Sequence, residues 1–504
     1  MQTSRPPALT FAEYSKHDAT ALAELVRKGE VTPVELLETA IARADVVNPK
    51  LNAIVTPLYD KGRDMAKQLP TTGSFRGVPF LLKDLELEWA GTPLRSGCRG
   101  YGNYVSPIDS EVVKRLKAAG LVLFGKTNTP EFGLTPYTES KLYGPARNPW
   151  KPTHSPGGSS GGSAVAVAAG IVPAATASDG GGSIRIPAAC CGLFGLKPSR
   201  GRVTLGPNFS EMWGGAVVSH AITRSVRDSA GLLDAIAGPF TGDPYGIAAP
   251  EWPFVQEVRR EPGHLRIAFS TQALMEAQPT DPVCVKAVQD TARLLESLGH
   301  TVEEVPLPYE KSIVTKAFFL NVLSETAATL RDLAEFLGRP VRRDDVELNT
   351  WALSRMAASY SAEDVAYQKR RWNTLNRNMG QLHETYDVFL TPTLPRPPIA
   401  IGTFQNTATE ERMLKLVDAV SGLKYLKGSK LVDELAEKSL NYIAYTVITN
   451  MTGQPSMSVP LHWSADGLPI GVMFAAKLGD EATLLRLAGQ LEQAQPWFEK
   501  RPAL

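Results

Sequence analysis

Two short segments rich in glycine and serine stand out in the first half of the chain. They are residues 157–163 (GGSSGGS) and residues 178–187 (SDGGGSIRIP). A serine hydroxyl becomes an effective nucleophile when a neighbouring base takes its proton. Glycine lets the backbone approach a reacting group closely, and successive glycine N–H groups can point at one developing negative charge. We therefore expect these two segments to surround a nucleophilic serine.

Residues 157–163 are open to two other interpretations. A Gly/Ser-rich run is typical of a flexible linker, but a linker is not followed at once by an apolar, helix-forming stretch such as residues 164–169. Residues 157–161 also match Gly-x-Ser-x-Gly, the nucleophile elbow of α/β-hydrolases, which must follow a strand. The preceding residues 152–156 (PTHSP) contain two prolines and cannot pair inside a central sheet. The sequence favours neither interpretation.

Residues 120–127 (GLVLFGKT) fit the phosphate-binding pattern G-x-x-x-x-G-K-[ST]. In a phosphate loop, the four middle residues form the loop that follows a strand. Here those residues are Leu-Val-Leu-Phe, which predict a buried strand in their own right. Nucleotide binding is therefore not expected.

The two Gly/Ser-rich segments, in this order and with 24 positions between Ser159 and Ser183, resemble the amidase signature family. Three further segments are also similar to that family: residues 78–84 (VPFLLKD), 450–455 (NMTGQP) and 468–472 (LPIGV). The resemblance extends from about residue 15 to residue 500. It implies an α/β fold, in which a mixed, twisted β-sheet covered by helices forms a single large domain over residues 1–504.

The resemblance also implies a Ser–cis-Ser–Lys catalytic triad. By motif position Ser183 is the nucleophile and Ser159 is the serine that relays its proton, with a cis peptide bond between Gly158 and Ser159. Lys83 is the base. The implied oxyanion hole consists of the backbone N–H groups of Ser183 and three glycines, and three polar residues take supporting positions. The glycines are Gly180, Gly181 and Gly182, and the supporting residues are Asp179, Arg185 and Ser160.

Lys83 can act as a base only when its amine is neutral. It follows the apolar run at residues 78–82, which indicates burial, and burial disfavours the ammonium form. Taken alone, a lysine after an apolar run is more typical of a surface position. The motif match favours the buried alternative.

The expected activity is hydrolysis of the C–N bond of a small amide, cyclic, aryl or carbamate-like, through an acyl-enzyme on Ser183. Four segments are most similar to a subgroup that hydrolyses cyclic amide dimers: residues 125–131, 146–150, 198–202 and 223–228. Residues 206–220, with Phe209 and Trp213, are predicted to form a loop near the acyl pocket or, alternatively, an ordinary surface loop.

One alternative is the glutamine-hydrolysing A subunit of a glutamyl-tRNA amidotransferase, which shares the triad. That family carries an acidic residue seven positions before the Asn of its C-terminal motif, and here Ile443 stands at the aligned position. The difference argues against glutamine as substrate and against tRNA partners. An alternative of another class is a catalytically inactive binding scaffold.

The elements that must position these residues alternate between helix and strand, as in an α/β protein. Residues 15–70 are expected to be mainly helical, and residues 312–379 and 403–438 are expected to be helical insertions in the single domain. Periodicity predicts helices at residues 19–28, 33–47, 110–119, 281–298 and 481–492. It predicts strands at residues 52–56, 78–82, 121–124, 264–270, 301–305, 388–391, 456–461 and 470–475.

Composition narrows the setting of this chemistry. The chain of 504 residues has 53 Lys plus Arg and 52 Asp plus Glu, so charge gives no reason to expect nucleic acid or an anionic membrane as a partner. The N-terminus lacks the pattern of a signal peptide, and the four cysteines have no metal-site spacing. We expect a cytoplasmic monomer or homodimer that uses no cofactor and no metal.

Overall fold

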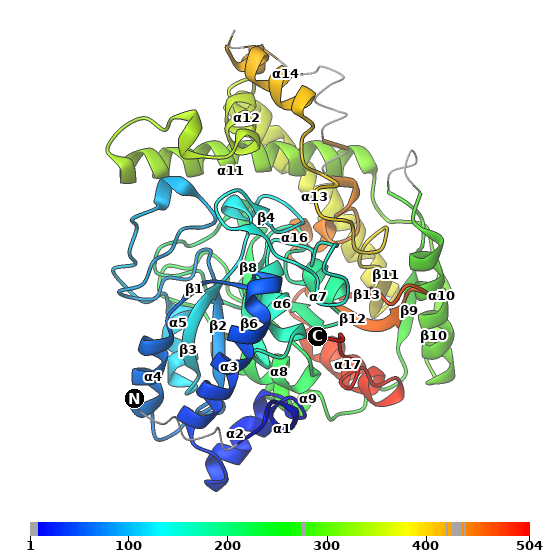
Figure 1. Cartoon of the computed structure of the whole chain (residues 1–504). Helices are drawn as coiled ribbons and strands as arrows, with labels where there is room; N and C mark the ends of the chain where they lie inside the picture. The colour runs from blue at the N-terminus through cyan, green and yellow to red at the C-terminus, as the bar shows by residue number, and fades with distance from the viewer. Residues whose placement is uncertain (1–8, 275–278, 420–421, 426, 428–435, 438–439) are drawn as a thin grey trace.

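A mixed β-sheet runs through the middle of the molecule (Figure 1). The computed structural model describes residues 9–274, 279–419, 422–425, 427, 436–437 and 440–504. Among these residues, eleven strands form the sheet in the order β1-β3-β2-β6-β8-β7-β12-β13-β11-β9-β10. Their bounds are β1 (Ile54–Pro57), β2 (Pro79–Lys83), β3 (Val122–Thr127), β6 (Ala174–Asp179), β7 (Phe194–Lys197), β8 (Val218–Thr223), β9 (Arg266–Phe269), β10 (Thr301–Glu304), β11 (Val388–Pro392), β12 (Ser456–Trp463) and β13 (Pro469–Ala476).

Parallel and antiparallel pairs both occur in this sheet. Strand β2 pairs in parallel with β3 and with β6, and β9 pairs in parallel with β10 and β11. The remaining pairs, such as β6 with β8 and β12 with β13, are antiparallel. A separate hairpin joins β4 (Glu139–Ser140) to β5 (Gly144–Pro145). The predicted mixed α/β sheet is confirmed.

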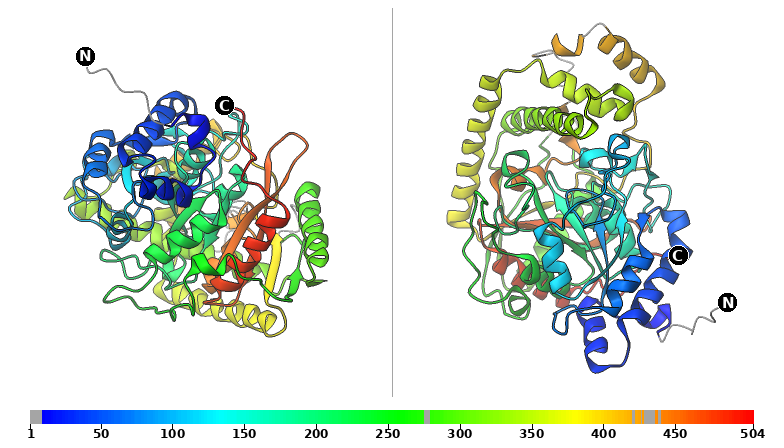
Figure 2. Two further views of the ribbon diagram at one scale, coloured as in Figure 1. Left: turned by 90° about the horizontal axis from the view of Figure 1, so that it is seen from below. Right: turned by 90° about the vertical axis from the view of Figure 1, so that its left-hand side faces the viewer.

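Helices pack on both faces of the sheet (Figure 2). On one face α6 (Gly161–Ala168) and α7 (Arg185–Cys191) pack against each other and against the central strands. On the other face lie α8 (Val226–Ile236), α9 (Phe254–Glu257) and α17 (Glu481–Ala494). The largest group of buried apolar side chains is continuous across these layers, so the chain forms a single large α/β domain.

The N-terminal helices are α1 (Phe11–Tyr14), α2 (Ala19–Lys28), α3 (Pro33–Leu51) and α4 (Tyr59–Lys67). Helix α3 begins as the sequence predicts, because the Thr32 side chain accepts from the Glu35 N–H while Pro33 occupies the first turn. Two more helices, α5 (Glu111–Ala118) and α10 (Pro282–Ser297), also lie where periodicity places them.

The predicted helical segment at residues 312–379 is confirmed as α11 (Lys311–Leu337), α12 (Leu348–Ala357) and α13 (Ala362–Thr385). In Figure 1, α11 crosses above the sheet and α12 lies beyond it. Of residues 403–438, the structure describes α14 (Ala408–Ala419) and a 3-10 turn at Gly422–Tyr425. The prediction for residues 420–421, 426, 428–435 and 438 lies outside the described residues. That both segments are insertions stays a prediction.

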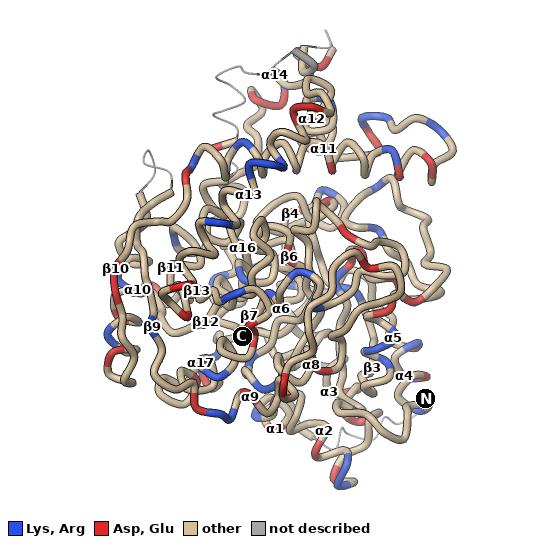
Figure 3. The backbone as a smooth tube through the Cα atoms, turned by 180° about the vertical axis from the view of Figure 1, so that it is seen from behind, with Lys and Arg blue, Asp and Glu red and all other residues tan. Residues whose placement is uncertain are grey.

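Charged residues of both signs are interspersed along the chain (Figure 3). This distribution agrees with the near balance of 53 basic and 52 acidic residues. Within the described ranges no helix is long and apolar enough to cross a membrane.

Candidate active site

The site forms where β2 and β6 end. These strands are parallel neighbours, with Leu81 opposite Ala175. The carboxyl ends of parallel strands meet at one edge of a sheet, so Lys83, the last residue of β2, lies close to Ser178 near the end of β6. Helix α6 begins at Gly161, two residues after Ser159, and places that serine at the same edge.

Lys83 is buried beside two serine hydroxyls. Its Nζ atom lies 2.8 Å from Ser159 Oγ and 3.0 Å from Ser178 Oγ, and its side chain is 1% exposed. Burial lowers the pKa of Lys83 to about 8, while the nearby carboxylates of Glu86 and Asp179 act in the opposite direction. An amine of this pKa exchanges its proton near neutral pH.

The backbone packs tightly around Ser159. Its peptide bond with Gly158 is cis, as the resemblance implies. A Cβ atom at Gly158 would lie 2.6 Å from the backbone nitrogen of Tyr137, so only glycine fits. A Cβ at Gly133 would lie 3.0 Å from Ser159 Oγ. Glycine at both positions therefore leaves room for the backbone and the hydroxyl of Ser159.

Ser183 lies between β6 and α7 and lines the same cavity as Ser159. Its side chain is half-buried and makes no hydrogen bond to the described residues. The backbone N–H groups next to Ser183 differ in whether they already have a hydrogen-bond acceptor. The Gly182 N–H donates to Asp179 Oδ1 at 2.7 Å, whereas the N–H groups of Gly180, Gly181 and Ser183 have no acceptor in the described part of the chain. Gly182, predicted to be an oxyanion donor, is therefore already engaged.

Asp179 and Arg185 form a fully buried ion pair beneath this glycine loop, with Arg185 Nη2 2.9 Å from Asp179 Oδ1. Burial alone would raise the pKa of Asp179, but the Arg185 guanidinium and hydrogen bonds, including one from Asn450, lower it to about 2. Asp179 also accepts from the Ile184 N–H at 3.0 Å. The carboxylate thus fixes the loop that carries Ser183.

Asn450 links this ion pair to the C-terminal motif. Its amide donates to the Asp179 side chain at 2.8 Å and accepts from Arg185 at 2.7 Å. Ser160, predicted to be a supporting residue, lies next to Ser159 and donates to the Ser178 carbonyl at 3.3 Å. Residues from the two halves of the chain therefore hold the site together.

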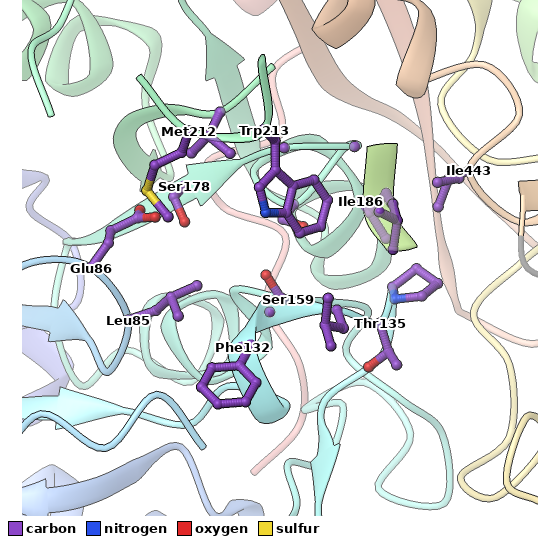
Figure 4. Close-up of a pocket in the computed structure, with 18 of the residues that line it drawn as sticks. Leu85, Glu86, Phe132, Thr135, Ser159, Ser178, Ile186, Met212, Trp213 and Ile443 are labelled. Atoms are coloured by element: carbon purple, nitrogen blue, oxygen red, sulfur yellow. The ribbon is translucent and has the colours of Figure 1, made fainter. Parts of the chain in front are cut away.

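Ser159, Ser178 and Ser183 line a cavity of about 90 Å³, and Figure 4 shows residues of its wall. Its wall contains one carboxylate, Glu86, and the hydroxyls of three serines and a threonine. The remaining wall is apolar or glycine. The apolar side chains are Leu85, Phe132, Leu134, Pro136, Ile186, Met212, Trp213, Val217, Phe318, Val322 and Ile443. Such a wall accommodates a small, largely apolar molecule.

Trp213 confirms that the loop at residues 206–220 reaches the cavity. Its ring packs edge-on against Phe318 with centroids 6.2 Å apart, and its carbonyl accepts from Asn321. Phe209, the other aromatic residue of that loop, is not among the wall residues and is 38% exposed. The loop prediction holds for one of its two aromatic residues.

The structure brings together every residue that sequence comparison placed at the site, and it adds Ser178, Glu86 and Asn450. Asn450 is the first residue of the C-terminal motif at residues 450–455, so the sequence did indicate its importance. Ser178 stands directly before Asp179. The sequence placed it in the glycine-rich segment but gave no separate indication of a role for it. Glu86 has no sequence signal beyond following Lys83 by three positions.

Comparison with known proteins identifies the family. The family model described as Amidase matches residues 35–485. The 6-aminohexanoate-cyclic-dimer hydrolase of Pseudomonas sp. (strain NK87) is 37% identical over 499 residues, covering 97% of this chain and 96% of that protein.

Solved structures agree with the sequence comparison. A 6-aminohexanoate cyclic dimer hydrolase complexed with substrate has a TM-score of 0.87 at 36% identity, covering 97% of this chain and 99% of that one. A bacterial aryl acylamidase of the amidase signature family has a TM-score of 0.84 at 26% identity, with coverage of 97% and 99%. The predicted family is confirmed, and so is the predicted similarity to the cyclic-dimer hydrolases. The chain belongs to the amidase family and is a hydrolase of amide C–N bonds.

Proposed function

We propose that Ser183 is the nucleophile, Ser159 the proton relay and Lys83 the base of this amide hydrolase. The observation that carries the proposal is the 2.8 Å contact between Lys83 Nζ and Ser159 Oγ, deep in a cavity that Ser183 also lines. Lys83 is the amine best placed to receive a proton there, and its lowered pKa makes the neutral form accessible.

In the first step, Ser183 Oγ attacks the carbonyl carbon of the amide. Its proton passes to Ser159 Oγ while the Ser159 proton passes to neutral Lys83, so the new C–O bond forms as the carbonyl oxygen takes up the negative charge. Lys83 then returns the proton through Ser159 to the leaving nitrogen, and the C–N bond breaks. Water attacks the acyl-enzyme by the same route and releases the acid.

The developing negative charge needs hydrogen-bond donors. The free N–H groups of Gly180, Gly181 and Ser183 lie on the loop that Asp179 fixes, and we assign the oxyanion hole to them. Loss of one such donor typically slows the reaction about 10²–10³-fold. Gly182 contributes by shaping the loop, because its φ of 131° is one that other residues rarely adopt.

The wall of the cavity indicates a small, neutral and mainly apolar amide, and the relatives that act on a cyclic dimer and on aryl acylamides point to the same class. Ile443 stands on the wall where the glutamine-hydrolysing alternative has an acidic side chain, so an ammonium group would find no partner there. Glutamine and tRNA are therefore not favoured. The four buried free thiols support a placement in the reducing cytoplasm. We further propose that the enzyme is a monomer or homodimer.

A fluorophosphonate probe tests the assignment of the nucleophile. We expect one probe per folded chain, attached to Ser183, and no labelling of Ser183→Ala. Ser160→Ala serves as a matched control, because Ser160 lies beside the relay serine but its hydroxyl bonds to a carbonyl. Labelling that persists in folded Ser183→Ala contradicts the proposal. A panel of aryl, cyclic aliphatic and linear aliphatic amides, carbamates and glutamine then identifies the substrate.

A further inference from the structure

Glu86 is the one charged side chain on the cavity wall within the described residues. It follows Lys83 by three positions and has a φ of 55°, a left-handed conformation that is uncommon for residues other than glycine. Such a conformation persists where surrounding contacts determine it, and it is found often at functional sites. We therefore expect Glu86 to have a role in the function of the site.

Two serine residues lie beside the Glu86 carboxylate. Ser219 Oγ donates to Glu86 Oε1 at 3.3 Å, and Ser178 lies close enough to lower the pKa of the Glu86 carboxyl. Ser178 Oγ in turn accepts a hydrogen bond from Lys83 Nζ at 3.0 Å. Glu86, Ser178 and Lys83 thus lie in a row that ends at the base. Figure 4 shows Glu86 and Ser178 together at one end of the cavity.

The direction of these hydrogen bonds follows from the groups involved. Because a carboxylate only accepts, the neighbouring Glu86 favours the orientation in which the single hydroxyl proton of Ser178 points at it. The oxygen of Ser178 is then left to accept from Lys83. A neutral amine has two N–H bonds and one lone pair, and an N–H must point at Ser178. The lone pair is thereby free to point at Ser159, from which Lys83 must take a proton.

We propose that Glu86 is a positioning residue for the amidase reaction: it orients the Ser178 hydroxyl so that the lone pair of Lys83 faces Ser159. This inference rests on the proposed role of Lys83 as the base. Glu86 touches the substrate cavity but acts on the chemistry through Ser178. No atom is transferred to Glu86 in the cycle, and its carboxylate is unchanged after turnover.

The charge of Glu86 has a second effect. The acidic groups that face Lys83 are Glu86 and Asp179, and both favour its ammonium form. Asp179 is neutralised by Arg185, so Glu86 is the less compensated of the two. Removing the Glu86 charge is therefore expected to make Lys83 lose its proton more easily.

The substitution Glu86→Gln tests the proposal through the pH profile of kcat/KM on an amide substrate. An amide side chain can donate to Ser178 as well as accept, so the orientation of the hydroxyl is lost together with the charge. We expect the midpoint of the rising acidic limb to move about 1 unit to lower pH. We also expect kcat on the plateau to fall about 10–100-fold, because the lone pair is no longer held in line.

Glu88→Gln is the matched control. Glu88 undergoes the same chemical change two positions along, but its carboxylate bonds to Tyr104 and Asn208 and is not on the cavity wall. Glu88→Gln should leave the midpoint of the acidic limb of the pH profile unchanged. Ser178→Ala should lower kcat as Glu86→Gln does, and Ser178→Thr, which keeps the hydroxyl, should restore it. Fluorophosphonate labelling and thermal unfolding establish that each variant is folded.

The proposal is overturned if folded Glu86→Gln keeps both the midpoint of the acidic limb and a plateau kcat within about twofold of the parent. That result differs from failure of the catalytic assignment itself. If Lys83 is not the base, Lys83→Ala retains amide hydrolysis. If only the role of Glu86 is wrong, Lys83→Ala loses most of its amide hydrolysis while Glu86→Gln behaves like the parent.

Discussion

The Nζ atom of Lys83 lies 2.8 Å from the Oγ atom of Ser159, although the two residues are 76 positions apart in the chain. The contact exists because β2 and β6 are parallel neighbours and helix α6 begins at the same edge of the sheet.

Activity should depend on pH through Lys83. The base is active when neutral, so kcat/KM is expected to rise with pH and to reach half of its plateau near the Lys83 pKa of about 8. Below that pH the ammonium form cannot take the Ser159 proton, and activity falls tenfold per unit. A pH series on a neutral amide, for which substrate ionisation does not interfere, measures this limb. Flat activity from pH 6 to pH 9 would contradict the assignment.

Replacing the base should affect amides and activated esters differently. Lys83→Ala removes both the base and the donor to the leaving nitrogen, so amide hydrolysis is expected to fall by about 10²–10⁴ or more. An activated ester has a leaving group that needs no proton, and it should retain a larger fraction of its rate. Parallel assays on a matched anilide and nitrophenyl ester measure the two losses. Equal amide rates in variant and parent would exclude Lys83 as the base.

Gly158→Ala should disrupt the site by steric overlap. The added methyl group would lie 2.6 Å from the backbone nitrogen of Tyr137, and the backbone cannot yield as a flexible side chain can. We expect a loss of about 1–3 kcal/mol in the free energy of unfolding together with loss of amide hydrolysis. Gly380→Ala, whose Cβ would meet nothing within 4 Å, is the control and should do neither. Urea unfolding and an amide assay give both readouts.

The Asp179–Arg185 pair predicts a large stability effect. Arg185→Met leaves the fully buried Asp179 carboxylate without its cation, and removing one partner of a buried pair costs about 3–5 kcal/mol. Surface pairs are worth far less. Arg27→Met, which breaks the exposed contact with Glu24, should therefore change the free energy of unfolding by less than about 1 kcal/mol. Similar losses in the two variants would contradict the structural role of the buried pair.

A charge at position 443 should redirect specificity. Ile443→Glu places a carboxylate on an apolar part of the cavity wall, close to Gly181. Unpaired burial of that charge is unfavourable with a neutral substrate, so kcat/KM for an apolar amide should fall at least about tenfold. An amide that carries an ammonium group should lose less, or gain. Ile443→Val is the control, and an unchanged ratio between the two substrates would show that this wall does not select for charge.

Parts of the fold were predictable because local patterns determined them. Helix α2 was predicted with its observed bounds, Ala19–Lys28, since its apolar spacing and its cap residues agree. Strands β6, β7 and β8 were not predicted. The sequence of β6, AATASD, is short, rich in small residues and buried on both faces, so it has neither alternation nor β-branched enrichment.

The site was predicted unevenly for a similar reason. Ser183, Ser159 and Lys83 lie in motifs that can be recognised in the sequence. Gly182 stands in the same glycine run as the free N–H donors, and only the structure shows that Asp179 has already engaged its N–H. A row of glycines contains no information on which N–H has an acceptor, because that acceptor is a side chain placed by folding.

By itself, the sequence determined the family and the chemistry and supplied the residue types of the proposed triad, since these depend on motifs a few residues long. Only the tertiary structure decided that Lys83 is buried and faces Ser159 and Ser178, that Trp213 and Ile443 are part of the cavity wall, and that Glu86 lies beside Ser178. The physical reason is that burial, pKa and hydrogen-bond direction depend on neighbours contributed by strands and helices far apart in the chain. Those neighbours are assigned by the order of strands in the sheet, which no single segment specifies.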